Sequence, residues 1–198
     1  MRHRSLVLGA LLVAASGLPE RARAQESVLV TVGAGGGAVL PVSDISNFFD
    51  LGWFAQANVG LDREGWPAGL RFDLVYRSLP GNDDLGSGNR LNILGALLNL
   101  ELTVLRTGEL GGLFLGGGPG LYYVDVDDTI EPILESGLRI ESSGQLEFGI
   151  FGGIAYKFDL DDVLLGIEVK YEGVFTDGGT SEFMPFGIVV EVPVNKRQ

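Results

Sequence analysis

Apolar and polar residues alternate one by one along most of the chain after Gln25. The clearest segment runs from Phe49 to Asp62, where every second residue from Phe49 to Leu61 is apolar. Successive side chains of a β-strand point to opposite faces, so this segment predicts a strand with one apolar and one polar face. Its length exceeds the usual 5–6 residues of a strand and suits a tilted, membrane-spanning strand of roughly 10 residues.

The same alternation recurs in seven further segments. They cover residues 28–34, 70–77, 94–103, 113–123, 145–158, 165–172 and 184–192. Two of them are less regular: Gly35, Gly36 and Gly37 follow the first, and Gly117 and Pro119 interrupt the segment 113–123. A proline fits a central strand only where a bulge accommodates it. The pattern predicts eight strands in all.

The segments between the predicted strands alternate in length. The connections near 63–67, 105–109 and 159–162 are short, and those near 39–48, 79–90, 125–143 and 176–182 are longer and rich in Gly, Asp, Ser and Asn. Short periplasmic turns and long extracellular loops are typical of outer-membrane barrels. In lipid, an unpaired strand edge leaves backbone groups unsatisfied, so the sheet has to close. We therefore predict an all-β fold: an eight-stranded antiparallel up-and-down transmembrane β-barrel with both termini in the periplasm.

Alternation alone does not say which face points outwards. A soluble periplasmic lipocalin-like carrier of an apolar ligand would alternate equally well, with its apolar face inside. Aromatic residues gather towards the predicted strand ends, as membrane-interface girdles require; they are Phe48, Phe49, Trp53, Tyr76, Tyr122, Tyr123, Tyr156, Phe158, Tyr171 and Phe175. The polar face mixes glycines with opposite charges, as a narrow lumen needs; the charged residues are Arg71, Asp73, Arg77, Glu147, Lys157, Glu168, Lys170 and Glu172. These features favour the membrane barrel and leave the soluble carrier as the alternative.

The first 24 residues predict a cleaved signal peptide. Arg2, His3 and Arg4 precede an apolar run from Leu6 to Leu18, and Ala22-Arg23-Ala24 places small residues where a signal peptidase reads them. The apolar run is shorter than the roughly 18–20 residues that a spanning helix needs. We therefore expect cleavage before Gln25, with residues 1–24 as signal peptide and residues 25–198 as the barrel domain.

Charge and composition narrow the function. The chain has 14 basic and 26 acidic residues, and the predicted signal peptide removes four basic residues and one acidic residue. The remaining net charge of −15 makes nucleic acid an unsuitable partner. There is no cysteine, and the only histidine, His3, leaves with the signal peptide. Most nucleophilic and zinc-dependent mechanisms require a histidine or a cysteine, and the mature chain would contain neither. We expect no enzyme, no catalytic, cofactor-binding or metal-binding residues, and no cofactor.

Two other groups of residues invite a ligand interpretation. The glycine clusters at 33–37 and 116–120 precede neither Lys-Ser/Thr nor a helical pattern, so they do not match phosphate-binding motifs. We interpret them as residues that make room inside a small barrel or permit strong coiling of the strands. An EF-hand would need glycine where Ile130 stands. We interpret the acidic residues as solvated loop charges that divalent ions could bridge to lipopolysaccharide; they are Asp125, Asp127, Asp128, Glu131 and Glu135.

The glycine–aromatic segments 115–123 and 148–156, with the eight-strand layout, give a family resemblance. The mature chain resembles the small OmpA/OmpX-type outer-membrane β-barrel domain proteins. The resemblance implies a location in the cell outer membrane, contact with outer-membrane lipid and lipopolysaccharide, and insertion by the barrel assembly machinery. The last strand of that family commonly ends on an aromatic residue, whereas this chain ends Val194-Asn195-Lys196-Arg197-Gln198.

The expected role is structural or a surface interaction through the extracellular loops. Eight strands enclose a space that side chains just fill, so we expect a filled lumen and no general porin activity. A membrane-embedded acyltransferase would rely on histidine-assisted chemistry, which the mature chain lacks. We expect a monomer.

Overall fold

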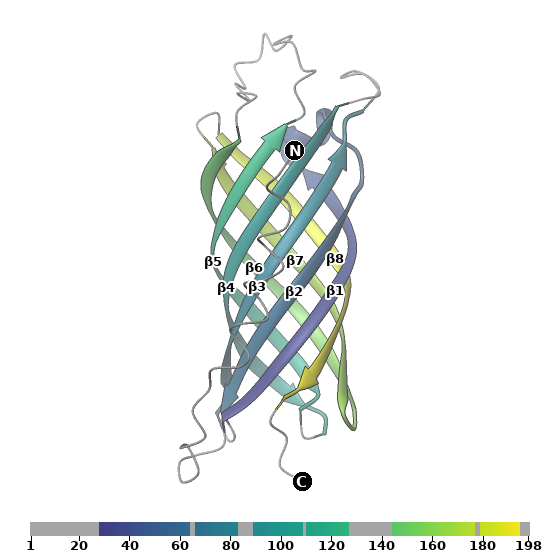
Figure 1. The fold of residues 1–198 in the computed structure, drawn as a ribbon, viewed down its shortest axis with the longest axis vertical. Helices are drawn as coiled ribbons and strands as arrows, with labels where there is room; N and C mark the ends of the chain where they lie inside the picture. Colours follow the sequence, from purple (N-terminus) through teal and green to yellow (C-terminus); the bar gives the residue numbers. More distant parts are fainter. Residues whose placement is uncertain are drawn as a thin grey trace, which may run out of the picture.

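The computed structural model describes residues 28–63, 66–82, 89–108, 110–126, 144–176 and 179–194. Eight antiparallel strands follow one another in sequence order around a closed barrel (Figure 1). They are β1 (Val28–Val42), β2 (Gly52–Arg63), β3 (Ala68–Pro80), β4 (Arg90–Arg106), β5 (Gly112–Val126), β6 (Gln145–Leu160), β7 (Val163–Thr176) and β8 (Gly179–Pro193). The predicted fold is confirmed, while the predicted signal peptide lies outside the described residues. None of the described helices is long and apolar enough to cross a membrane.

The barrel closes through the pairing of the first and last strands. The β1–β8 ladder runs from Thr31 opposite Pro193 to Val42 opposite Glu182. This closure leaves no strand edge with unpaired backbone groups, which is the condition for a β-sheet to survive in lipid. The strands are strongly tilted relative to the long axis of the barrel, as Figure 1 shows.

Pro119 lies inside β5 without a bulge. It pairs with Ile150 of β6, but the β4–β5 ladder is interrupted between the pairs Leu97–Gly120 and Leu100–Gly117. The register is the same on both sides of this gap. A proline has no backbone N–H, so it removes one hydrogen bond of the ladder without shifting the pairing of the residues around it. The register shift in this ladder lies elsewhere, between Thr103 and Leu105.

The connections differ from the prediction at two places. At one end, here the short-turn end, the strands are joined through residues 64–67, 107–111 and 161–162; at the other, the long-loop end, through 43–51, 81–89, 127–144 and 177–178. The predicted long connection at 176–182 is wrong, because Thr180 and Glu182 pair with Phe175 and Gly173 in the β7–β8 ladder. The predicted connection at 39–48 is too long, because β1 continues to Val42. Both segments look like loops by composition, and strand pairing overrides that preference.

The apolar face of the barrel points outwards. Leu94, Leu98 and Leu100 of β4 are each 47–50% exposed, whereas the charged side chains of the polar face are buried inside. A soluble carrier needs a polar exterior, and the exterior of this barrel is apolar instead.

Candidate functional site

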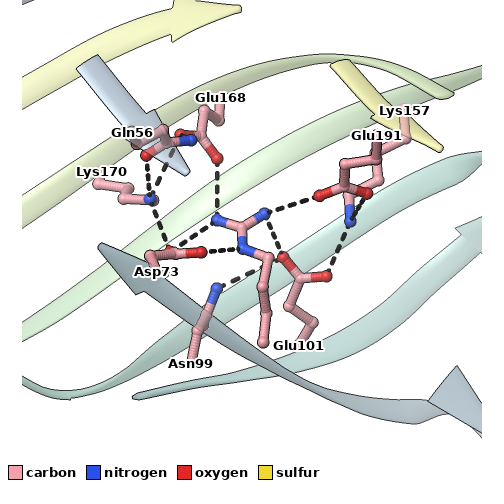
Figure 2. Close-up of polar contacts among 9 residues, drawn as sticks. Gln56, Asp73, Asn99, Glu101, Lys157, Glu168, Lys170 and Glu191 are labelled. Atoms are coloured by element: carbon pink, nitrogen blue, oxygen red, sulfur yellow. Dashed lines mark hydrogen bonds and ion pairs between the residues drawn. The ribbon is translucent and has the colours of Figure 1, made fainter. Parts of the chain in front are cut away.

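A network of charged side chains from facing strands lies in the part of the lumen nearer the short-turn end; Figure 2 shows Asp73, Glu101 and Lys157 among its members. Arg71 of β3 contacts four of its carboxylates. The Arg71 guanidinium donates from Nε and Nη2 to Asp73, at 2.7 and 3.1 Å. It also lies 3.0 Å from Glu168 and 2.7 Å from Glu101. A fourth carboxylate, that of Glu191, is 3.6 Å away. Five planar N–H donors allow one arginine to bind several carboxylates in this way.

Two lysines complete the network from other strands. Lys157 of β6 contacts Glu101 at 2.9 Å and Glu191 at 3.0 Å. Lys170 of β7 contacts Asp73 at 3.2 Å and Glu168 at 3.3 Å. Gln56 of β2 donates to Glu168 at 2.6 Å and accepts from Lys170 at 3.3 Å. The contacts therefore join six of the eight strands across the lumen (Figure 2).

The network combines three cations with four carboxylates, all of them buried. Burying an unpaired charge costs several kcal/mol, so each charge here requires its partners. Among the described residues, no group of three or more acidic side chains is placed to hold a metal ion. What this arrangement supplies is electrostatic cross-linking of the wall.

A small cavity lies beside Arg71. Its lining includes Asn99, Glu101, Phe114, Gly116 and Lys170, and the volume open to the centre of a water molecule is about 10 Å³. That is room for about one water molecule. The Oδ1 atom of Asn99 has no hydrogen-bond partner among the described residues and is a suitable acceptor for such a water.

The half of the lumen nearer the long-loop end is mainly apolar. We call this set the apolar plug; its buried members are Val39, Ile45, Phe49, Phe54, Val75, Leu79, Leu91, Ile93, Leu97, Tyr122, Phe151, Val174 and Phe183. The short 3-10 helix η1 (Ser43–Asn47) supplies Ile45, and Phe49 follows it. The N–H of Asp50 donates to the carbonyl of Pro80 and the N–H of Asn82 to that of Phe48, both at 2.9 Å. These bonds tie the β1–β2 connection to the end of β3.

One ion pair is embedded in the apolar plug. Arg77 of β3 contacts Glu172 of β7 at 2.5 Å, and the Tyr122 hydroxyl of β5 donates to the same Glu172 oxygen at 3.3 Å. Arg77 also lies 5.7 Å from the centre of the Tyr122 ring. The three residues link strands on different sides of the lumen.

Most charged residues assigned to the polar face from the sequence do point into the lumen, and seven of them take part in these ion pairs: Arg71, Asp73, Arg77, Lys157, Glu168, Lys170 and Glu172. Glu147 is only half-buried. Two predicted girdle aromatics are wrong: Phe49 and Tyr122 are almost completely buried. Phe49 turns inwards because it lies in the connection after η1, where the alternation of β2 has not yet begun.

The glycine interpretation is confirmed at Gly33 and Gly116. A Cβ at Gly33 would lie 2.7 Å from Asn58 and Glu191, and one at Gly116 would lie 2.7 Å from Asn99. Both glycines thus make room for polar lumen side chains. Of the acidic loop residues, Asp125 lies in β5, and the other four lie outside the described residues.

The sequence pattern did not predict the apolar plug. Most of its members occupy the inward positions of the strands, which were assigned to the polar face because they alternate with the outward apolar residues. A signal existed: on the predicted inward face, the positions nearer the long-loop end include Phe54, Val75 and Leu97. Such residues inside a barrel indicate a packed core.

Comparisons with known proteins identify the fold. Neisserial surface protein A (NspA) is 16% identical, with a TM-score of 0.52, over 82% of this chain and 96% of that one. OprG of Pseudomonas aeruginosa is 13% identical (TM-score 0.48; 84% and 97% covered), and Ail, the attachment invasion locus protein of Yersinia pestis, is 9% identical (TM-score 0.46; 84% and 99% covered). No protein-family model matches the chain, and no curated protein matches it. The closed eight-stranded wall and its apolar exterior thus have the fold of a small outer-membrane β-barrel, NspA.

Proposed function

We propose that this protein is an outer-membrane barrel with a structural or surface-interaction role, exerted through the connections at its long-loop end, and that it is not a general porin. The apolar plug is the observation that carries the proposal. Val39, Leu79 and Tyr122 within it are completely buried. Hydrated ions and small solutes would have to cross a packed layer whose side chains are mainly apolar, which costs them part of their hydration.

The exterior supports the proposed placement in lipid. Large apolar side chains project from every strand. The ring pairs Trp53–Tyr76 and Phe148–Phe175 lie near strand ends, at centroid distances of 5.5 and 6.1 Å. Aromatic residues prefer the two membrane interfaces. In outer-membrane barrels the short turns are periplasmic and the long loops extracellular, which gives the orientation that we adopt.

The proposed surroundings follow from this placement. The exterior would contact outer-membrane lipid, the long-loop end would lie among lipopolysaccharide headgroups, and the barrel assembly machinery would insert the chain. We propose that the protein acts as a monomer, is not an enzyme and does not bind nucleic acid. It needs no cofactor.

Bilayer recording tests the closed lumen. Protein that shifts its gel mobility on heating, and is therefore folded, is inserted into planar lipid bilayers. We expect no large and stable conductance. A porin-like conductance from the folded wild-type protein would refute the proposal.

Cysteine labelling tests location and orientation, because the chain contains no cysteine of its own. Ser46→Cys places a thiol at the long-loop end, and Thr107→Cys places one at the short-turn end; both positions are exposed. A membrane-impermeant maleimide applied to intact cells should label the first variant only. The second should react after the outer membrane is permeabilised. The reverse pattern would invert the orientation, and no labelling of either variant in intact cells would overturn the surface location.

A further inference from the structure

Two neighbouring turns at the short-turn end bring two arginines together around one exposed tryptophan. Trp66, in the β2–β3 connection, is 53% exposed. The guanidinium of Arg63, at the end of β2, lies 4.5 Å from the centre of the Trp66 ring. Arg106, the last residue of β4, donates from Nη2 to the Trp66 carbonyl at 3.2 Å. We call these three residues the rim cluster.

The turns that carry the rim cluster are tied to each other. The N–H of Thr103 in β4 donates to the carbonyl of Pro67 at 2.7 Å. This bond and the one from Arg106 hold the β2–β3 connection against β4. The backbone at Trp66 and Pro67 is therefore held in place by hydrogen bonds to its carbonyl groups. A backbone that is already ordered reduces the conformational entropy lost when a ligand binds.

The wall next to the rim cluster exposes extra apolar surface. The register shift between Thr103 and Leu105 turns two successive residues outwards. Val104 and Leu105 are each 55% exposed, directly before Arg106. A regular strand would expose one of them. Aliphatic surface thus adjoins the two guanidinium groups, as the acyl chains of a lipid adjoin its headgroup.

The charged residues near this end of the barrel lie in two sectors. Four of the basic residues, Arg71, Arg77, Lys157 and Lys170, are buried in the lumen. Of the described acidic residues near this end, Asp62 directly precedes Arg63 in β2, and the others lie in and beside the β6–β7 turn: they are Asp159, Asp161 and Asp162. Asp159 accepts a hydrogen bond from the N–H of Leu110 at 3.0 Å. Glu64 and Glu109 belong to the same connections as the rim cluster and lie outside the described residues. Whether this sector attracts an anionic headgroup is therefore decided by comparing the binding of anionic and zwitterionic lipids directly.

We propose that the rim cluster binds the phosphate headgroup of an anionic phospholipid in the leaflet at the short-turn end. Guanidinium groups bind phosphate oxygens through paired N–H donors. Tryptophan anchors at the headgroup level, with its ring in the acyl boundary and its N–H towards water. The inference rests on the proposed placement in a membrane and names a lipid partner for it.

The two tryptophans of the chain allow a site-specific test, because they lie at opposite ends of β2. Trp53→Phe leaves Trp66 as the only fluorophore, and Trp66→Phe leaves Trp53. Each variant is folded into vesicles that contain phosphatidylcholine with increasing fractions of phosphatidylglycerol. The acyl chains of one lipid or the other are brominated to quench fluorescence. Arg106→Gln is then added to the Trp53→Phe background, with Arg90→Gln, at the other end of β4, as the matched control.

We expect Trp66 to be quenched by brominated phosphatidylglycerol with a preference of about fivefold over phosphatidylcholine, the effect of roughly one basic residue at a membrane surface. Arg106→Gln should abolish the preference, Arg90→Gln should leave it, and Trp53 should show none. Equal quenching of Trp66 by the two lipids, or a preference that survives Arg106→Gln, overturns the rim cluster as a lipid site. These outcomes leave the membrane placement intact. Folded protein in which neither tryptophan is quenched by either lipid would overturn the placement itself, and the lipid site with it.

Discussion

The ion pair between Arg77 and Glu172 offers a direct measure of what a buried charge contributes to this barrel. Both side chains are at most 1% exposed and lie among apolar residues. Arg77→Met leaves the Glu172 carboxylate with the Tyr122 hydroxyl as its remaining partner among the described residues. Removing one member of a buried pair costs about 3–5 kcal/mol, because the other charge stays buried and uncompensated. We expect a loss of that size in the free energy of unfolding.

Removing both charges should cost much less. In the wild-type chain, Nε and Nη1 of Arg77 and Oε1 of Glu172 have no hydrogen-bond partner among the described residues. Each unsatisfied buried group costs about 1–3 kcal/mol, so Arg77→Met/Glu172→Leu removes three such penalties along with the ion pair. The double variant leaves the Tyr122 hydroxyl without its acceptor, and adding Tyr122→Phe should recover that loss. The triple variant should be as stable as the wild type or more stable by about 1–4 kcal/mol, as apolar replacement of buried ion pairs is elsewhere.

Urea unfolding of the protein in phosphatidylcholine vesicles, followed by tryptophan fluorescence, measures these differences. Arg90→Met, at the exposed end of β4, is the control and should change the free energy of unfolding by no more than about 0.5 kcal/mol. If the single and the triple variants lose the same free energy, an uncompensated charge is not the source of the cost. The reasoning would then fail.

Three further substitutions test the wall and the network by the same unfolding measurement. Gly120→Val should destabilise strongly, because its Cβ would lie 2.6 Å from the Leu97 and Tyr122 side chains, whereas Gly152→Ala has room and should be neutral. Leu98→Arg, near the middle of the exterior, should lower the free energy of unfolding by about 2–4 kcal/mol. Leu51→Arg, next to the start of β2, should lower it by at most about 1 kcal/mol. Equal losses would contradict the placement of Leu98 near the middle of the membrane. Arg71→Met should cost at least as much as Arg77→Met, because four carboxylates lose their shared cation, and a near-neutral result would show that Lys157 and Lys170 suffice.

Part of the lumen could be predicted from the sequence. The charged residues of the polar face were identified by their alternation with outward apolar residues, which is a local property of a strand. Their partners could not be identified, because Arg71 and Glu168 are 97 positions apart and meet only across the closed barrel. For the same reason, the ion pairs of Glu101 and Glu191 could not be predicted from the sequence, because they depend on the register of β4 and β8.

The sequence by itself determined the number of strands, the division of each strand into an apolar and a polar face, and the lack of cysteine. These follow from period-two alternation and composition, which need no knowledge of distant contacts. Only the tertiary structure decided that the apolar face points outwards, that Ile45 and Phe49 are buried in the apolar plug and that residues 179–182 pair as a strand. It also separated a charged part of the lumen from the apolar plug. These outcomes depend on the tilt and register of a closed sheet, which bring residues from opposite walls to the same height.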